Sequence, residues 1–183
     1  MAESELFPSL LLDKALQDAL PKSYILRPLA RGDYSKGFFE NFKGLASTGD
    51  VTREQFLEQF DWMKTKADVF YNVVIEHDDR IVANGMLMVE RKFIWGLGKV
   101  GHIEEISVSE SHQGKGLGKC IIEALNSVAR NVGCLKTILD CDEDHEPFYI
   151  KCGYERTGLE MTQDFEAMQE WRAMDRSSSD SDI

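Results

Sequence analysis

The sequence lacks the marks of several classes of protein. No stretch approaches the roughly 20 consecutive apolar residues that cross a bilayer. Residues 1–20 carry acidic side chains and lack the basic start of a signal peptide. The formal net charge is −11, from 21 basic and 32 acidic residues, which argues against nucleic acid or an anionic membrane as the main partner. We therefore expect a cytoplasmic protein without membrane insertion, whose ligands are small molecules.

Cysteine is scarce and shows no pairing pattern. The four cysteines have neither CxxC nor zinc-type spacing. Cys120 lies inside a helical stripe and Cys141 at the end of an apolar segment, so we interpret both as small core residues. The run from Glu143 to Glu146, which includes His145, is interpreted as a solvated loop and not as a metal site.

The composition is that of an ordinary globular protein, with 43% hydrophobic and 29% charged residues. A chain of 183 residues is long enough for one domain with a substantial core. We expect an N-terminal lead-in over residues 1–20, one domain over 21–165, and an acidic, Ser/Asp-rich tail over 166–183. The leucines of the lead-in predict a short helix, ended by Pro21, that lies on the body or on a partner chain. The tail is expected to start as a helix and then become disordered.

Alternating and helical patterns predict the order β-α-α-β-β-β-α-β-α-β, a mixed sheet flanked by helices. Asp33 is expected to cap the first main helix. Thr52 and Gln55 form a capping box that opens the second. The predicted inward stripes are Phe38, Phe42 and Leu45 on the first helix and Phe56, Phe60 and Met63 on the second. The predicted strands cover residues 24–29, 68–77, 81–93, 101–108 and 136–140, with a last strand or strands over 154–165 and a short helix starting near 147–150.

One stretch combines a strand, a glycine-rich turn and a helix. Alternation from Ile103 to Val108 predicts the strand, and Gly114-Lys115-Gly116-Leu117-Gly118 precedes the helix. The first N–H groups of a helix have no internal partner and carry positive potential, so such a junction binds a phosphate without a special side chain. The turn matches neither the Walker pattern nor the GxGxxG of a dinucleotide site. The stripe of the helix consists of Leu117, Ile121, Leu125, Val128 and Val132.

A family resemblance is carried by this turn and three flanking motifs. The turn, QGKGLG over residues 113–118, resembles the Q/R-x-x-G-x-G/A pyrophosphate loop of the GNAT superfamily of acyl-CoA N-acyltransferases. The sequence as a whole looks like the eukaryotic glucosamine-6-phosphate N-acetyltransferases over residues 22–165, through the ordered motifs GHIEEISV, QGKGLGK, GCLKTILDCDE and FYIKCGY. The resemblance implies the GNAT fold, an α/β (α+β) arrangement with a mixed, mostly antiparallel sheet flanked by helices.

The resemblance also implies a reaction. It is the acetyl-CoA-dependent N-acetylation of D-glucosamine 6-phosphate, which supplies UDP-N-acetylglucosamine, by direct attack of the amine on the thioester. In the superfamily the pantetheine arm of acetyl-CoA lies against the central strand like an added strand. The residues that this implies for cofactor binding are Ile106, Ser107, Val108, Gln113, Gly114, Lys115, Gly116, Leu117, Gly118, Lys119, His145 and Tyr149.

Four catalytic positions follow from the resemblance. The N–H of Val108 is the candidate that polarises the thioester carbonyl, and the hydroxyl of Tyr149 matches the tyrosine that faces the departing sulfur. Asp140 ranks first as the base, because a carboxylate that ends an apolar strand is expected to be partly desolvated. Glu105 ranks second, with Glu104 as its rival, because adjacent strand residues face opposite sides and only one can enter a given cleft.

The implied sugar-phosphate site is completed across a homodimer, with residues near Lys136 supplied by the neighbouring chain. Asp164 stands where the family usually has an arginine that binds the phosphate, and a carboxylate there would repel it. Two alternatives therefore stay open: an acetyltransferase for a polyamine, small amine or protein amine, and a non-catalytic acyl-CoA-binding module. The implied substrate-binding residues are Lys92, Phe93, Ile94, Trp95, Glu104, Glu105, Leu135, Lys136 and Asp164.

Overall fold

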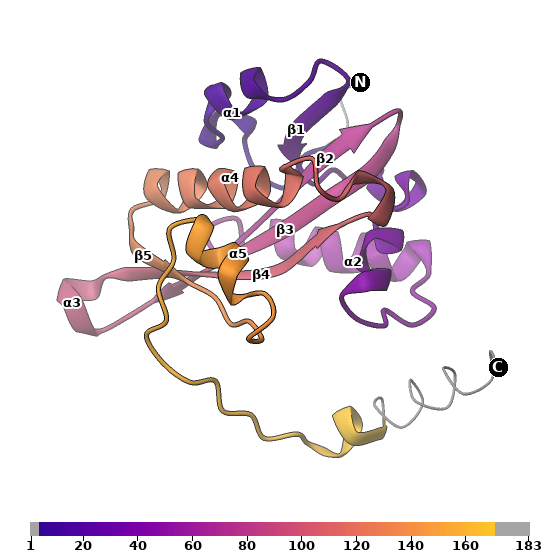
Figure 1. The fold of residues 1–183 in the computed structure, drawn as a ribbon. Coiled ribbons are helices and arrows are strands. Elements are labelled where there is room, and N and C mark those ends of the chain that lie inside the picture. Colours follow the sequence, from indigo (N-terminus) through magenta and orange to yellow (C-terminus); the bar gives the residue numbers. More distant parts are fainter. Residues whose placement is uncertain (1–3, 171–183) are drawn as a thin grey trace.

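The computed structural model describes residues 4–170 and contains one five-stranded sheet (Figure 1). Its strands follow one another in chain order, β1 to β5. The first four are antiparallel neighbours, and the last pairs parallel with the fourth. Within the described residues, no helix is long and apolar enough to cross a membrane. The strands are β1 (Tyr24–Pro28), β2 (Phe70–His77), β3 (Arg80–Arg91), β4 (Lys99–Val108) and β5 (Cys134–Ile138).

The long helix α4 (Leu117–Asn131) packs on one face of the sheet, above it in Figure 1. Its predicted apolar stripe is confirmed, since Leu117, Ile121, Leu125 and Val128 are buried. Gly85 of β3 lies beneath this helix. A Cβ atom there would lie 2.5 Å from Ile106 and 2.6 Å from Ile121, so only glycine allows this approach.

The opposite face carries two short 3₁₀ turns and a helix. The turns are η2 (Asp33–Lys36) and η3 (Phe39–Gly44), and the helix is α2 (Arg53–Lys64). The capping box predicted for α2 is confirmed: the hydroxyl of Thr52 accepts from the N–H of Gln55, whose side chain accepts from the N–H of Thr52. An aromatic cluster joins the turns to the helix through Phe38, Phe39, Phe42, Phe56 and Phe60.

The prediction of one helix capped by Asp33 is wrong, because this carboxylate has a different use. Asp33 lies inside η2 with a fully buried side chain. Its carboxylate accepts two hydrogen bonds from Arg27, at 2.7 and 2.8 Å, and one from the N–H of Ala30 at 2.7 Å. Gly37, at φ 77°, then separates the two 3₁₀ turns. Leu45, expected to face inward, is exposed.

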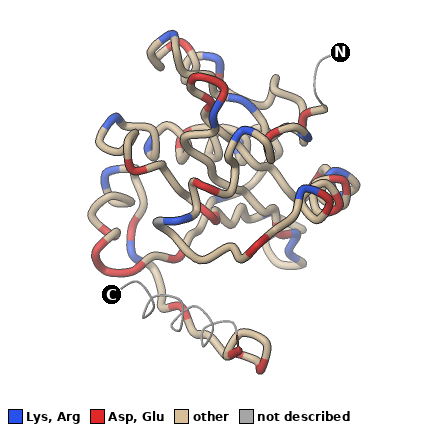
Figure 2. Tube along the Cα trace, turned by 90° about the vertical axis from the view of Figure 1, so that its right-hand side faces the viewer, with Lys and Arg blue, Asp and Glu red and all other residues tan. Residues whose placement is uncertain are grey.

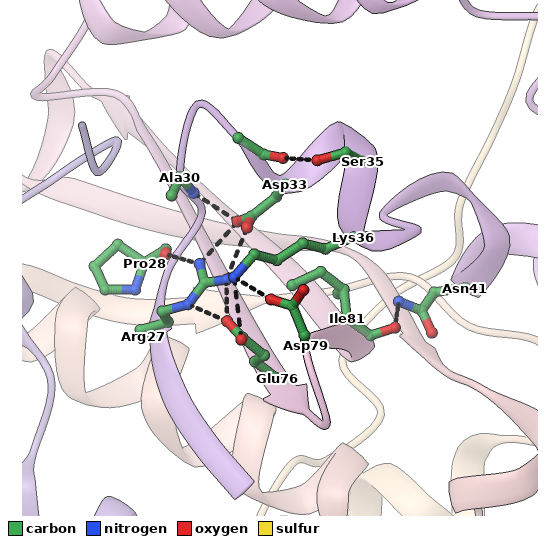
Figure 3. A network of polar contacts seen from close by, with 11 residues as sticks. Arg27, Pro28, Ala30, Asp33, Ser35, Lys36, Asn41, Glu76, Asp79 and Ile81 are labelled. Atoms are coloured by element: carbon green, nitrogen blue, oxygen red, sulfur yellow. Dashed lines mark hydrogen bonds and ion pairs between the residues drawn. The ribbon is translucent and has the colours of Figure 1, made fainter. Parts of the chain in front are cut away.

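Arg27 extends this contact into a network of charged groups (Figure 3). Its guanidinium also donates to Glu76 of β2, at 2.6 and 3.0 Å. Lys36 contacts Glu76 at 3.1 Å and Asp79 at 3.0 Å. The network therefore ties β1, η2 and the β2–β3 turn together.

The N-terminal lead-in packs against the body of its own chain. Leu6 and Phe7 are buried in the main core. The short helix α1 (Lys14–Ala19) follows the 3₁₀ turn η1 (Ser9–Leu11) and ends before Pro21, as expected. The side chain of Gln17 fixes the helix on β1, since it donates to the carbonyl of Tyr24 and accepts from the N–H of Leu26.

Two expectations for the C-terminal half are wrong. The strand predicted over 136–140 runs from Cys134 to Ile138, and the chain then leaves the sheet, so Cys141 is exposed and does not belong to the core. No strand forms over residues 154–165, because the segment finds no partner strand within the described chain. It runs away from the sheet in Figure 1, with Leu159 90% and Met161 93% exposed. Residues 166–170 are helical, and the disorder expected further on falls outside the described residues.

We predict that Asp33→Ala destabilises the protein by about 3–5 kcal/mol, because it leaves a buried arginine with one of its two carboxylates. The matched control is Asp61→Ala. It removes a carboxylate that binds Arg31 through two 2.9 Å hydrogen bonds at an exposed position, where little stability is lost. Urea unfolding of both variants measures the difference. Equal midpoints for the two would contradict the structural role given to Asp33.

Candidate active site

The sheet is open along one edge of β4. The parallel pairing of β4 with β5 ends at His102 and Ile138, whereas β4 continues to Val108. The N–H of Ser109 donates to the carbonyl of Val82 in β3 at 2.9 Å. Because successive N–H groups of a strand point to opposite sides, that of Val108 points away from β3, toward the open edge. The end of β4 thus offers backbone groups to an extended ligand.

A β-bulge interrupts β4 at the same place. Asn84 of β3 lies opposite Ser107 and Met86 opposite Glu104, so Glu105 and Ile106 share one partner residue. Glu105 has a φ of 57°, which is uncommon for a residue other than glycine. The side-chain amide of Asn84 donates to the carbonyl of Glu105 at 2.8 Å and holds the bulge.

The bulge overturns the expected alternation of Glu104 and Glu105. Gly101 and Ile106 both face α4, although their odd spacing places them on opposite faces of a regular strand. Beyond the bulge, the hydroxyl of Ser107 donates to the carbonyl of Asn41 in η3, on the opposite face. The regular alternation assumed for the two glutamates therefore does not hold at the bulge.

The carboxyl group of Glu105 has a perturbed acidity. The residue is exposed at the surface, but its carboxyl group is partly buried among protein atoms. This burial, together with the nearby charge of Glu104, raises the pKa of the Glu105 carboxyl above its ordinary value. Such a group accepts a proton more readily than an ordinary glutamate does.

Two carboxyl groups, those of Glu104 and Asp140, lie next to the His102 side chain. The Nε2 atom of His102 lies 3.1 Å from Oε1 of Glu104 and 3.2 Å from Oδ2 of Asp140. Asp140 comes two residues after the end of β5, and its side chain is 50% exposed. The strand ends earlier than predicted, so Asp140 does not end it and is only partly covered by protein.

The glycine-rich turn lies between the end of β4 and α4. Gly114 and Gly116 have φ of 73° and 79°, and a Cβ atom on either would meet nothing within 4 Å, so the backbone is accessible. Gly116 is the N-cap of α4 and provides no side-chain cap, which leaves the first N–H groups of the helix for a ligand. The amide of Gln113 donates to the carbonyl of Val108 and links the turn to the open edge. Lys115 and Lys119 are exposed beside it.

Tyr149 lies on the short helix α5 (Glu146–Lys151), whose predicted start is confirmed. A Cβ atom on Gly118 would lie 3.4 Å from Phe148 and 3.6 Å from Val108, so α5, the start of α4 and the end of β4 meet. Burial, with smaller effects of Cys141 and Cys152, raises the pKa of Tyr149 to about 12. The phenol is therefore neutral near pH 7 and has a proton to donate. His145 at the N-cap contacts Asp142 at 2.7 Å and is exposed.

Of the other substrate positions, Lys92 pairs with Glu90, which lies 3.6 Å from His102, whereas Lys136 and the residues of α3 lie further from the bulge. Lys136 pairs with Val100, five residues before Glu105, which corresponds to about 17 Å along β4. Its ammonium lies 5.6 Å from the ring centroid of Trp95. Trp95 belongs to α3 (Ile94–Leu97), at the far end of the sheet in Figure 1. Asp164 lies in the extended segment after α5. The exposed apolar residues of the β3–β4 end are Phe93, Ile94, Trp95, Leu97 and Leu135.

Figure 2 shows acidic and basic residues interspersed along the tube, without a continuous basic stretch. This distribution agrees with the negative net charge and with a small ligand.

Sequence reasoning missed His102 and Asn84. His102 is one of four histidines scattered along the sequence, although its spacing of two residues from Glu104 places both on one face of a strand. Asn84 is a polar residue inside the apolar run of β3, which is a signal for a specific hydrogen bond nearby. The sequence does not reveal the partner of either residue, because Asp140 lies far from His102 along the chain and Glu105 lies far from Asn84.

Comparison with known proteins identifies the family. The Acetyltransferase (GNAT) family matches residues 33–154. The glucosamine 6-phosphate N-acetyltransferase of Candida albicans is 42% identical over 143 residues, which cover 78% of this chain and 96% of the relative. Glucosamine 6-phosphate N-acetyltransferase 1 of Dictyostelium discoideum is 42% identical over 138 residues, or 74% and 87% of the two chains.

The crystal structure of glucosamine-6-phosphate N-acetyltransferase from Arabidopsis thaliana superposes with a TM-score of 0.77 at 37% identity. The match covers 79% of this chain and 100% of the other, and it confirms the fold expected from the sequence. The chain therefore belongs to the GNAT family of acetyltransferases and, within it, to the glucosamine 6-phosphate N-acetyltransferases.

Proposed function

We propose that this protein transfers the acetyl group of acetyl-CoA to the amine of D-glucosamine 6-phosphate and forms N-acetyl-D-glucosamine 6-phosphate. The observation that carries the proposal is the open edge of β4, which ends beside an accessible glycine turn and a neutral tyrosine. The relatives named above support the choice of acceptor. The product belongs to the synthesis of UDP-N-acetylglucosamine, and we propose a cytoplasmic location.

The residues present fit acetyl-CoA. Ile106 and Val108 offer backbone groups on the open edge for the pantetheine amides, in the manner of an added strand. Ser107 contributes no such group, because alternation turns its backbone toward β3 and its hydroxyl binds Asn41. The accessible backbone from Gly114 to Gly118 and the start of α4 suit the diphosphate, with Lys115 and Lys119 close by.

The proposed mechanism is a direct displacement within a ternary complex. Asp140 accepts a proton from the acceptor ammonium, and the neutral amine then attacks the thioester carbonyl. The N–H of Val108 donates to the carbonyl oxygen as negative charge develops there. The carbon–sulfur bond breaks and Tyr149 gives its phenolic proton to the departing thiolate, while the attacking nitrogen gives up its second proton, which restores the phenol. Glu105 is the alternative base, because its raised pKa suits proton transfer from an ammonium.

We also propose a homodimer in which the partner completes the acceptor site. Two observations support it. Lys136 lies about 17 Å from the bulge of its own chain, too far to reach the same substrate group. Apolar residues are exposed at the β3–β4 end and in the segment after α5, with Phe93 97% exposed.

The dimer is tested by sedimentation equilibrium. We expect twice the chain mass at micromolar concentration and a shift toward the monomer in the double variant Phe93→Ser, Trp95→Ser, with the acceptor KM rising as the dimer is lost. A wild-type monomer that turns over normally would refute the proposal.

The acceptor is tested by thiol release from acetyl-CoA with glucosamine 6-phosphate, glucosamine and a polyamine in parallel. We expect kcat/KM for the phosphorylated sugar to exceed that for glucosamine by at least about tenfold, the value of one charge-assisted contact. Such a preference also requires that cationic groups compensate for Asp164. Equal rates with and without the phosphate would move the function to another amine, and the absence of turnover on all three would favour an acyl-CoA-binding role.

Three variants separate the catalytic roles. We expect Asp140→Asn and Tyr149→Phe each to lower kcat by roughly 100-fold or more, the usual contribution of a general base or acid, with little change in the KM for acetyl-CoA. The decrease in kcat caused by Glu105→Gln should be smaller. Steady-state kinetics with glucosamine 6-phosphate measures all three.

The pH profile decides between the two carboxyl groups. If Glu105→Gln causes the larger loss, Glu105 is the base. Its raised pKa keeps the carboxyl protonated to higher pH, so the acidic limb of kcat/KM in the wild type would then lie above the ordinary glutamate range. An acidic limb that disappears in Asp140→Asn and persists in Glu105→Gln would support Asp140.

A further inference from the structure

The mechanism leaves one group at the site unused, the imidazole of His102. It lies on β4 with its side chain 18% exposed, and charged groups from three elements face it. Glu90 comes from β3, at 3.6 Å from Nδ1, and Glu90 itself pairs with Lys92. Glu104 comes from β4 and Asp140 from the segment after β5, and both lie within hydrogen-bond distance of Nε2.

The two ring nitrogens play different roles. A carboxylate can only accept hydrogen bonds, so an Nε2 atom that faces two carboxylates carries a proton. The 3.6 Å between Nδ1 and Glu90 is too long for a hydrogen bond. The directional contact of His102 is therefore the hydrogen bond from Nε2 to Asp140, with Glu104 close by at 3.1 Å.

Asp140 depends on this contact more than Glu104 does. Asp140 lies beyond the last paired residue of β5 and is half exposed, so the sheet does not fix its side chain. Within residues 4–170, His102 is the one side chain that hydrogen-bonds its carboxylate. Glu104 is held in addition by the β3–β4 ladder, through its register with Met86.

We propose that His102 is a positioning residue for the acetyl transfer, which holds the Asp140 carboxylate toward the acceptor amine through Nε2–H and joins it to Glu104. The inference rests on the proposed role of Asp140 as the base. A misplaced base lowers the rate of proton transfer without weakening the binding of the acetyl donor, because the donor contacts lie further along β4 and in the glycine turn.

The two ring nitrogens can be tested separately by substitution. Glutamine places an amide donor near the position of Nε2, and asparagine places one near Nδ1. We expect His102→Ala and His102→Asn to lower kcat for glucosamine 6-phosphate by about tenfold to 100-fold, the range for a hydrogen bond to a charged group. His102→Gln should recover most of that loss, and the Kd for acetyl-CoA should stay within about twofold in all three.

His77→Gln is the matched control. His77 also contacts a carboxylate, at 3.4 Å from Asp78, and is about as buried, but it lies at the β2–β3 turn. We expect the His77→Gln variant to keep the wild-type kcat. Thermal unfolding of every variant identifies any that fail to fold. Equal losses in the glutamine and asparagine variants, or an unchanged kcat in His102→Ala, would overturn the inference.

A double-mutant cycle tests whether His102 acts through Asp140. In the Asp140→Asn background, His102→Ala should lower kcat less than threefold further, because the group that it positions is already lost. A full additional loss would overturn the inference. The failure of the proposed function is a separate result: the wild type would then prefer another amine, and the same cycle on that amine would still test His102.

Discussion

The structure depends on the point at which the parallel strands β4 and β5 stop pairing. From Lys99 to His102, β4 is an interior strand with β3 on one side and β5 on the other. After His102 the chain of β5 turns away, and β4 alone continues to Val108. The consequence is a row of backbone donors and acceptors without a partner strand inside an otherwise complete sheet. Although residues 109–116 separate α4 from this strand, the start of the helix lies against Val108, so its free N–H groups lie at the end of the same row. A donor with amides and a diphosphate can thus be bound by backbone alone.

The bulge gives the same strand a second property. A regular strand would send Glu104 and Glu105 to opposite faces, and one of them would be useless to a reaction at the open edge. The extra residue, supported by Asn84 across the ladder, changes the direction of the strand at the position where the chemistry is proposed. It also places a carboxyl group in a conformation that only glycine adopts easily, at a cost of order 1–3 kcal/mol. The paired ladders on both sides and the packing of Ile106 beneath α4 offset that cost.

The sequence was sufficient wherever the determining contacts are local. The capping box of Thr52 and Gln55, the stripe of α4 and the glycine turn involve residues within a few positions of one another, and all were predicted. The failures have distant causes. Asp33 does not cap a helix, because its carboxylate belongs to a buried network with Arg27 and Glu76. These two residues lie 49 positions apart in the sequence. The bulge at Glu105 requires the register with β3. The last strand was predicted from its apolar residues, but a strand needs a partner, and the described chain offers none.

The open row on β4 has a consequence for solubility. An unpaired strand edge normally invites pairing with other copies of the chain, and it is a common origin of aggregation. Here the free donors lie between β4 and the chain that leaves β5, and not at an outer edge of the sheet. The true outer edges are β1, which ends in a proline, and β5, which carries a lysine. Both residues are typical of edges that discourage such pairing. The fold thereby exposes backbone groups for ligand binding at an interior strand, while its two outer edges carry residues that disfavour pairing with other chains.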